Sequence, residues 1–380
     1  MGTEQTTGWK PGELQVHAIH TGRGEAFFFI FPDATTMLLD CGDVSPRNNP
    51  NDDIVPPFPD ATRSPGEWIA RYVLAANPAP VPAWVDWLVI SHYHSDHVGG
   101  RRGISAKRPA GLAAASRTLH FRHALDRGRP GRDAPRPEAD GDGSLALWER
   151  CRRRLAKRDG LAVERFEVGR RDQIHPLHGG AKDFSIFNLC ANGLVADERN
   201  GHVTDICDGL SGYSENAMSL GMVIRYGVFS LYTAGDFSGR VRDKDGVEVD
   251  LEERLAPFVP PVTAAKVNHH GHYTMPAALV AALRPRVWFG SVWTLRQFVP
   301  PVMERLSDRS LYPDDRTICP PFIPPARIAE ARAAKAAWLC DIPPEILASR
   351  TGGHVILTVP PGGQNFNIDY LTPPIERTTP

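Results

Sequence analysis

The sequence lacks the long apolar runs that would place it in a membrane or on a secretion route. No run in its 380 residues approaches the roughly 18 apolar residues that a membrane-spanning helix needs. Residues 1–10 are polar and carry no apolar stretch, so no secretory signal is predicted. We therefore expect a cytoplasmic protein with no membrane partner.

Cysteine is also scarce, and charge of one sign is not in excess. The six cysteines are widely spaced without a CxxC pair, which favours reduced, buried thiols over disulfides. The 43 basic residues nearly balance the 44 acidic ones, giving a formal net charge of −1. This balance argues against bulk attraction to nucleic acid or to a membrane, although local basic patches stay open.

What the sequence has instead is one dense group of histidines, SHYHSDHVGG at residues 91–100. The β-branched, apolar residues 84–90 before it predict a buried strand. The potential metal ligands in this HxHxDH pattern are His92, His94, Asp96 and His97. Extended backbone points the first two histidines to the same side, and the other two groups follow where the chain turns. One pair can then hold one metal while the other faces a second position. Imidazole with carboxylate suits zinc, and also manganese or iron.

Two further predicted strands end at an aspartate. Residues 36–39 lead into Asp40, which either accepts the free N–H of a ligating histidine or is an aspartate in a glycine turn. Residues 218–226 and 228–233 predict a hairpin that ends at Asp236. Asp236 can bridge two metals or be an ordinary turn residue, and beside the HxHxDH pattern we favour the ligand.

A third predicted strand, residues 264–267, delivers imidazoles at its end, in the sequence NHHGH at 268–272. One of His269 and His270 is expected to be a metal ligand, and we favour His270. The other would donate a proton or orient a ligand. His272 is a further candidate for contact with substrate and for proton donation.

Other patterns predict a mixture of helices and strands. Ser64-Pro-Gly-Glu67 predicts a helix with a capping box that runs to about Ala76. The polar, glycine-rich residues 194–214 predict a loop, and the alanine-rich residues 327–339 predict a helix. Alternating patterns predict strands at 13–19, 26–31, 161–168, 184–190, 355–359 and 366–370.

Basic residues gather in one part of the chain. Residues 101–137 carry ten Lys/Arg against two acids and are predicted to be partly helical around 110–125. A helix predicted over 144–158 adds six more basic side chains. Such a surface fits an anionic small molecule or a nucleic acid. The alternative is a solvated surface balanced by acids elsewhere.

Together these motifs resemble the ComEC-type branch of the metallo-β-lactamase-fold hydrolases. The resemblance is carried by LQVHAIHTGRGEA at 14–26, MLLDCG at 37–42, NAMSLG at 216–221, TAGD at 233–236 and KVNHHG at 266–271. It implies an α/β (α+β) protein with a four-layer αββα sandwich and metals at one edge between the sheets. It also implies one domain over 1–380, with a basic insertion at about 101–160 and an added helical segment at about 311–350.

The resemblance implies two divalent metals, zinc in the first place, with manganese or iron as alternatives. Its motifs carry over as ligands onto His92, His94, Asp96, His97, Asp236 and His270 or His269, with Asp40 at the strand end. The chain also departs from the family. His20 and Glu25 stand where the family has acids near the site, and the separate histidine of the first metal is replaced by Glu215 or Asn216.

The expected activity is hydrolysis. Two neighbouring metals lower the pKa of a bridging water to roughly 7, and the resulting hydroxide attacks phosphorus or a carbonyl carbon. Asp96 would hold a metal and accept a proton, while His272 or the spare histidine protonates the leaving oxygen. We expect a phosphodiesterase of nucleotide or nucleic-acid type. The alternatives are a lactonase, thioesterase or β-lactamase-like hydrolase, and a non-catalytic binding module with a degenerate metal site.

Overall fold

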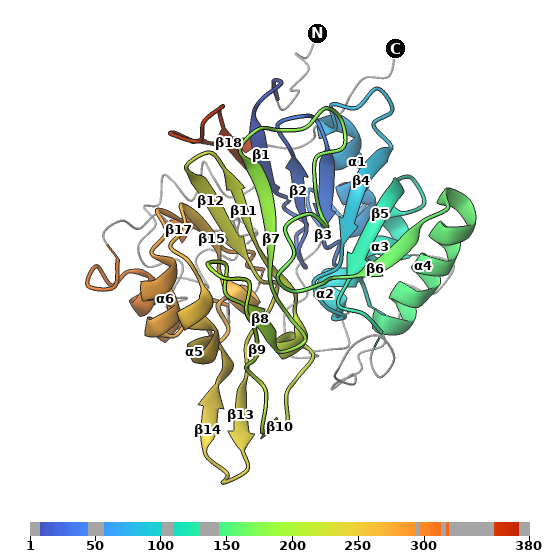
Figure 1. Cartoon of the computed structure of the whole chain (residues 1–380). Helices are drawn as coiled ribbons and strands as arrows, with labels where there is room; N and C mark the ends of the chain where they lie inside the picture. Colours follow the sequence, from blue (N-terminus) through green and yellow to red (C-terminus); the bar gives the residue numbers. More distant parts are fainter. Residues whose placement is uncertain are drawn as a thin grey trace.

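Two large β-sheets organise the chain (Figure 1). The computed structural model describes residues 8–44, 57–100, 109–129, 144–293, 297–312, 317–318 and 353–371. Each large sheet has eight strands, and a third sheet has three. The expected mixed α/β class is confirmed at this level. No helix within the described residues is both long and apolar enough to cross a membrane.

The first sheet joins both ends of the described chain. Its strands lie in the order β19 (Asn367–Leu371), β18 (His354–Val359), β1 (Leu14–Ala18), β2 (Phe27–Ile30), β3 (Thr36–Leu39), β4 (Trp84–Val89), β5 (His120–Asp126) and β6 (Ala162–Arg165). The strands from β19 to β3 pair antiparallel, whereas β3 through β6 pair parallel. The predicted closing hairpin is therefore confirmed, and it pairs with β1.

The second sheet has a similar mixed construction. Its order is β17 (Thr317–Ile318), β16 (Val287–Phe289), β15 (Ala264–Lys266), β12 (Phe229–Thr233), β11 (Gly221–Tyr226), β7 (Phe184–Ala191), β8 (Leu194–Ala196) and β9 (Val203–Asp205). The predicted hairpin at Gly227 is β11–β12, and β12 continues parallel to β15. The small third sheet contains β10 (Leu210–Ser211), β13 (Arg240–Asp243) and β14 (Glu248–Asp250).

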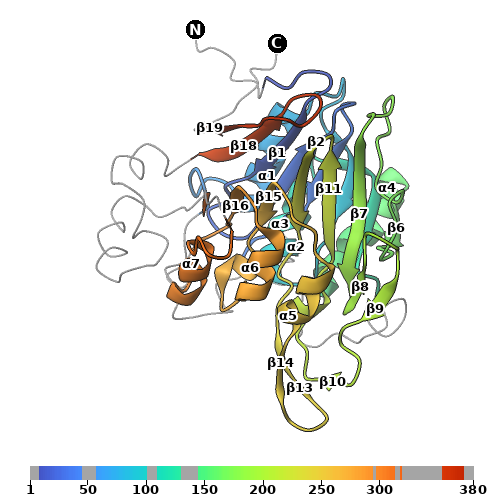
Figure 2. The ribbon, with the colours of Figure 1, turned by 60° about the vertical axis from the view of Figure 1, so that its left-hand side comes forward.

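Helices cover the outer face of each large sheet (Figure 2). On the first sheet lie α1 (Pro65–Ala76), α3 (Gly111–Ala115) and α4 (Ser144–Asp159). On the second lie α5 (Leu251–Leu255), α6 (Ala277–Leu283) and α7 (Pro300–Leu306). Helix α1 begins at the predicted capping box, in which the Ser64 and Glu67 side chains each accept the other residue's backbone N–H. This cap contributes on the order of 1 kcal/mol to the helix.

Alternation along the strands divides the core into three parts. Phe27 and Phe29 of β2 face the second sheet, where the Phe27 ring packs edge-on against Phe289 of β16, with 6.2 Å between the ring centroids. Phe28 and Ile30 point the other way, toward the helices of the first sheet. A full side chain of this size contributes about 1.5–3 kcal/mol when buried. The two sheets thus pack face to face through one shared core, and the helices add one core on each outer side.

One prediction about the less regular stretches is confirmed only in part, and another is wrong. The predicted partial helix around 110–125 is helical only in α3, and residues 120–126 form β5, because pairing with β4 buries Phe121 and Leu125. Residues 194–214 are not a loop but contain β8, β9 and β10, whose two or three residues are too short to show an alternating pattern.

Parts of the predicted insertions fall outside the described residues. These are 101–108 and 130–143 of the basic insertion and nearly all of the 311–350 segment, including the helix predicted at 327–339. The described part of the basic insertion supplies α3, β5 and α4. Strand β5 pairs with β4 on one side and β6 on the other, so this part is built into the first sheet.

Candidate metal centre

The predicted site residues meet because parallel strands end at a common edge. Strands β3 and β4 run parallel in the first sheet, and β12 and β15 run parallel in the second. Asp40 follows β3, the HxHxDH segment follows β4, Asp236 follows β12, and His270 follows β15. Since the carboxyl ends of parallel strands lie at the same edge of a sheet, the packing of the two sheets brings all four segments together.

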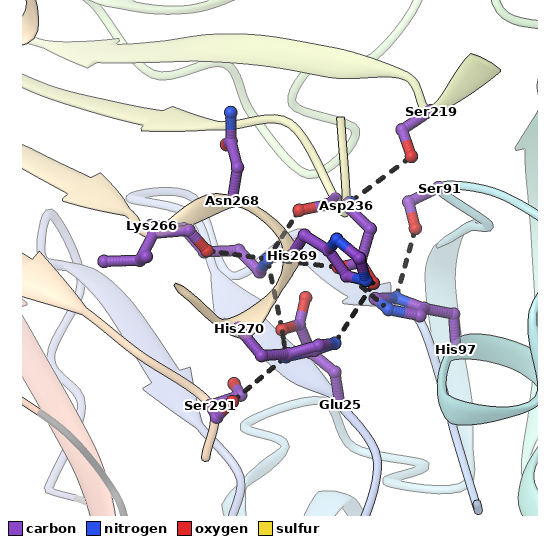
Figure 3. Close-up of polar contacts among 12 residues, drawn as sticks. Glu25, Ser91, His97, Ser219, Asp236, Lys266, Asn268, His269, His270 and Ser291 are labelled. Carbon is purple, nitrogen blue, oxygen red and sulfur yellow. Dashed lines mark hydrogen bonds and ion pairs between the residues drawn. The ribbon is translucent and has the colours of Figure 1, made fainter. Parts of the chain in front are cut away.

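Four of the predicted ligands converge on one point, and Figure 3 shows three of them, His97, Asp236 and His270. The donor atoms of Asp96, His97, Asp236 and His270 all lie within 4.8 Å of one another. His97 Nε2 lies 3.1 Å from Asp236 Oδ1, and His270 Nε2 lies 3.2 Å from Asp236 Oδ2. His270 Nε2 is also 3.4 Å from Asp96 Oδ2. Two imidazoles and two carboxylates therefore face one position, a donor set that suits zinc or manganese.

The rings of both histidines are held from behind. His97 Nδ1 lies 2.7 Å from Asp40 Oδ2, and His270 Nδ1 lies 3.0 Å from the Ser291 carbonyl oxygen, so each Nδ1–H can donate there and each Nε2, once deprotonated, can coordinate a metal. Asp40 is held in turn by the Ser91 hydroxyl and backbone N–H, at 2.6 and 2.8 Å. Acceptors behind ligating histidines fix their tautomer in this way in metal sites.

The atoms that point inward have no hydrogen bond. His97 Nε2, His270 Nε2 and both Asp236 carboxylate oxygens are buried without one. Buried polar atoms are nearly always satisfied in folded proteins, so such a group of unsatisfied atoms calls for a ligand. A cation coordinated by these atoms would satisfy all of them together.

The charges also favour a cation. Burial lowers the pKa of His97, but the carboxylates of Asp236 and Asp40 outweigh it and raise that pKa well above its ordinary value. In His270 burial also acts downward, yet Asp236 raises the pKa to about 9. Burial acts to raise the pKa of Asp236, but the imidazoles of His270 and His97 hold it well below the usual range. Without a metal, the two imidazoles therefore hold protons tightly beside the carboxylates, and a bound cation would replace those protons.

Glycine lets the backbone segments approach one another closely. A Cβ on Gly42 would lie 1.6 Å from the Asp96 carbonyl oxygen, so only glycine fits beside the turn that carries Asp96 and His97. This approach is fastened by the Asp43 N–H, which donates to the Ser95 carbonyl oxygen, and by the Glu25 N–H, which donates to the Asp96 carbonyl oxygen. The turn before β2 and the turn after β3 thereby fix the position of the HxHxDH segment.

His92 and His94 lie beside this cluster without being part of it. His92 Nε2 is 3.1 Å from His94 Nδ1, and His92 Nδ1 is 3.1 Å from the Ser91 hydroxyl. Burial, followed by the neighbouring His97, lowers the pKa of His92 well below its ordinary value. Within the described residues these two histidines join no third donor in a compact metal-binding group. A second metal ion at this position stays a prediction.

Glu215 and Asn216, which stand where the family has the separate histidine of the first metal, have other partners. Glu215 is fully buried, accepts two bonds from the Arg127 guanidinium at 2.7 and 2.5 Å, and accepts one from the Tyr93 N–H at 3.1 Å. The Asn216 side-chain amide lies 3.2 Å from His269 Nε2. Arg127 therefore neutralises the carboxylate that would otherwise resemble a ligand.

The remaining predicted histidines take separate places. His269 Nε2 is 4.0 Å from Asp236 Oδ2, farther than His270, which supports His270 as the ligand of the pair. The ring of His272 lies 5.4 Å from that of His269. Burial and the neighbouring His269 lower the pKa of His272 to about 4, so its ring is neutral at pH 7. Its role as a proton donor stays a prediction.

The sequence motifs assigned no role to one buried residue of the site, Lys266. Lys266 Nζ lies 3.2 Å from Glu25 Oε2 and 3.8 Å from Asp236 Oδ1, and the lysine side chain is 2% exposed. A lysine at the end of an apolar strand was the available signal, because lysine is almost never fully buried unless it is paired. His20, in contrast, stacks on Phe58 at 4.0 Å and takes no part in this cluster.

Comparison with known proteins assigns no family to the chain: no family model matches it, and no curated protein matches it significantly.

Proposed function

We propose that this protein is a metal-dependent hydrolase of the metallo-β-lactamase fold that cleaves phosphodiester bonds. The observation that carries the proposal is the convergence of Asp96, His97, Asp236 and His270 on one point between the two sheets. The packing order of helices, sheet, sheet and helices supports the αββα sandwich that the sequence motifs imply.

The residues present fit a divalent metal ion. Asp96, His97, Asp236 and His270 would hold it, and Asp40 and the Ser291 carbonyl would keep the two imidazoles in the ligating tautomer. When bound, such an ion supplies Lewis acidity, which activates water and withdraws charge from the attacked group.

The chain's own groups provide the rest of the site. Asp96 is the one member of the cluster with appreciable exposure, 21% of its side chain, whereas the other three are at most 1% exposed. Substrate and solvent therefore reach the cluster on the Asp96 side, where its carboxylate can accept a proton from water. Lys266 balances part of the carboxylate charge from the buried side.

A phosphodiester is favoured over a neutral ester by the surface of α4. Arg150, Arg153 and Lys157 lie on one exposed side of this helix, at the spacing i, i+3, i+7. Arg154 and Arg158 donate instead to backbone carbonyls next to α3, so they are structural. A cationic helix side raises the local concentration of a polyanion.

A second candidate is a non-catalytic binding module that holds one metal. Its support is the engagement of Glu215 by Arg127, which leaves His92 and His94 without a third ligand from that position. Such a module would bind metal at the same cluster but would hydrolyse nothing.

Hydrolysis of bis-(4-nitrophenyl) phosphate with added Mn²⁺ or Zn²⁺ tests the proposal. Metal-dependent turnover is expected for the wild type, with a loss of at least about a hundredfold in Asp96→Asn and Asp236→Asn. Asp172→Asn, which changes an exposed carboxylate far along the chain, serves as the control. Turnover of a neutral ester alone would move the activity to the carboxylic-ester class, and metal binding without any turnover would favour the binding module.

A further inference from the structure

The loop that follows β15 has an unusual backbone. His269, His270, Tyr273 and Met275 all have positive φ angles, of 46°, 52°, 48° and 57°. Residues other than glycine rarely adopt this conformation, and they do so where the surrounding structure enforces it, commonly at functional sites. Here the strained stretch begins at His269 and includes the candidate metal ligand His270.

The end of this loop is fixed by several hydrogen bonds. The Arg305 guanidinium donates to the carbonyl oxygens of Met275 and Thr274, at 2.6 and 2.8 Å. The Met275 N–H donates to Glu252 Oε2 at 3.0 Å, and the Thr274 hydroxyl donates to the Asn268 carbonyl oxygen at 2.9 Å. Met275 itself is fully buried. The loop is therefore held rigidly on the side that follows Tyr273.

The other side of Tyr273 is fixed as well. The His270 carbonyl oxygen accepts the Phe298 N–H at 3.2 Å, and the His272 N–H donates to the His269 carbonyl oxygen at 2.9 Å. A Cβ on Gly271 would lie 2.3 Å from the Phe298 ring, so glycine is needed for this close approach. Tyr273 thus sits between two anchored segments.

Between these anchors, the Tyr273 side chain contributes nothing to the core. It is 73% exposed and is the one aromatic among the exposed large hydrophobic side chains of the described residues. It lies three positions after His270, which limits its Cα to about 11 Å from the Cα of that candidate ligand. Folding therefore gives no reason for an exposed aromatic side chain on this rigid, strained loop beside the candidate metal centre.

We propose that Tyr273 is a stacking platform for a nucleobase next to the scissile phosphodiester. The substrates would then be nucleotides. This inference rests on the proposed phosphodiesterase function. A rigid ring loses little entropy when it stacks, and every base offers an aromatic face, so the contact would favour nucleotides over phosphodiesters without a base and would tolerate different sequences.

Two substrates with the same leaving group test the inference. Thymidine 5′-(4-nitrophenyl) phosphate carries a base, and methyl 4-nitrophenyl phosphate does not. Tyr273→Ala is expected to raise KM for the thymidine substrate by about tenfold or more, the usual effect of removing one stacking side chain. The methyl substrate should be cleaved as by the wild type. Tyr273→Trp should retain the preference for the base.

The variants are chosen so that a change in KM cannot arise from a loss of folding. Alanine keeps the Cβ and the same backbone strain as tyrosine, so the substitution removes only an exposed ring. Val81→Ala, at another exposed apolar position (56%) before the amino end of β4, is the control. Binding of thymidine 5′-monophosphate to the metal-free proteins, followed by ligand-observed NMR, gives a second readout that needs no turnover.

The outcomes separate the two proposals. If the wild type hydrolyses neither substrate with any metal, the phosphodiesterase proposal fails, and the NMR titration alone then decides whether Tyr273 binds a base. If both substrates are hydrolysed but Tyr273→Ala changes their KM values equally, or not at all, the stacking platform is refuted while the phosphodiesterase stands.

Discussion

The buried pair of Arg127 and Glu215 gives the sharpest prediction about stability. Both side chains are fully buried, and the guanidinium donates two bonds to the carboxylate and a third, of 3.0 Å, to the Asn192 side-chain oxygen. Arg127 also lies over the Tyr93 ring, 5.0 Å from its centroid. The pair therefore joins the end of β5 to the metal-binding turn and to the second sheet.

Removal of the arginine alone should be costly. Arg127→Met removes both guanidinium bonds from the buried Glu215 carboxylate, while the Tyr93 N–H still donates to it. Breaking a buried ion pair from one side costs about 3–5 kcal/mol, a large part of the roughly 5–15 kcal/mol that stabilises an ordinary domain. Adding Glu215→Gln removes the unpaired charge. The double variant should recover part of the loss, with a coupling energy of about 2–3 kcal/mol.

Urea unfolding of the four proteins in this cycle, followed by circular dichroism and tryptophan fluorescence, measures these terms. The exposed pair Arg170–Asp172 offers a matched control, because solvent screens this pair and Arg170→Met should cost far less stability than Arg127→Met. A loss below about 1 kcal/mol for Arg127→Met would refute the reasoning. Glu215→Gln should also leave zinc affinity unchanged, and a large drop there would instead identify Glu215 as a ligand.

Three further predictions concern the ligand support, acid stability and the cationic helix side. Asp40→Asn should weaken zinc binding, measured by calorimetry, about 10- to 100-fold, because His97 Nδ1 loses its anionic hydrogen-bond acceptor. Unchanged zinc affinity would show that Asp40 does not support His97 as a ligand. Burial holds the pKa values of His17 and His354 at about 3, below their value of 6.5 when unfolded. The unfolded chain therefore binds protons first as the pH falls, and each histidine should remove about 2–3 kcal/mol of stability between pH 7 and 4.5. In His17→Gln this acid slope, measured by urea unfolding at several pH values, should be shallower, and an identical slope would argue against a buried neutral histidine. Arg150→Glu with Lys157→Glu should weaken binding of a single-stranded oligonucleotide and flatten its salt dependence, and equal salt slopes would remove that surface from substrate binding.

The regular parts of the fold could be predicted from the sequence because their patterns are local. The capping box at Ser64 and the hairpin at Gly227 depend on residues a few positions apart, and both are confirmed. Strand β5 could not be predicted, because its arginine and histidines interrupt the apolar pattern of the residues that pairing with β4 buries. The strands of two or three residues, such as β8, form only because a neighbouring strand is already in place.

The site shows the same division. The candidate ligands at strand ends, Asp236 and His270 among them, could be proposed from the sequence because a polar group after an apolar strand is visible there. Their grouping depends on which strands run parallel and how the two sheets pack, which no local pattern contains. The pairing of Glu215 with Arg127 spans 88 positions, so spacing alone left Glu215 open as a ligand.

The central claim is that the cluster of Asp96, His97, Asp236 and His270 binds a divalent metal ion. Calorimetric titration of Zn²⁺ into metal-free protein tests it most directly, with His97→Ala and His270→Ala compared with His175→Ala, which removes an exposed histidine. We predict that the wild type and His175→Ala bind zinc equally, and that each cluster variant loses at least about a hundredfold in affinity. Equal binding by all four proteins, or no binding by the wild type, would contradict the account.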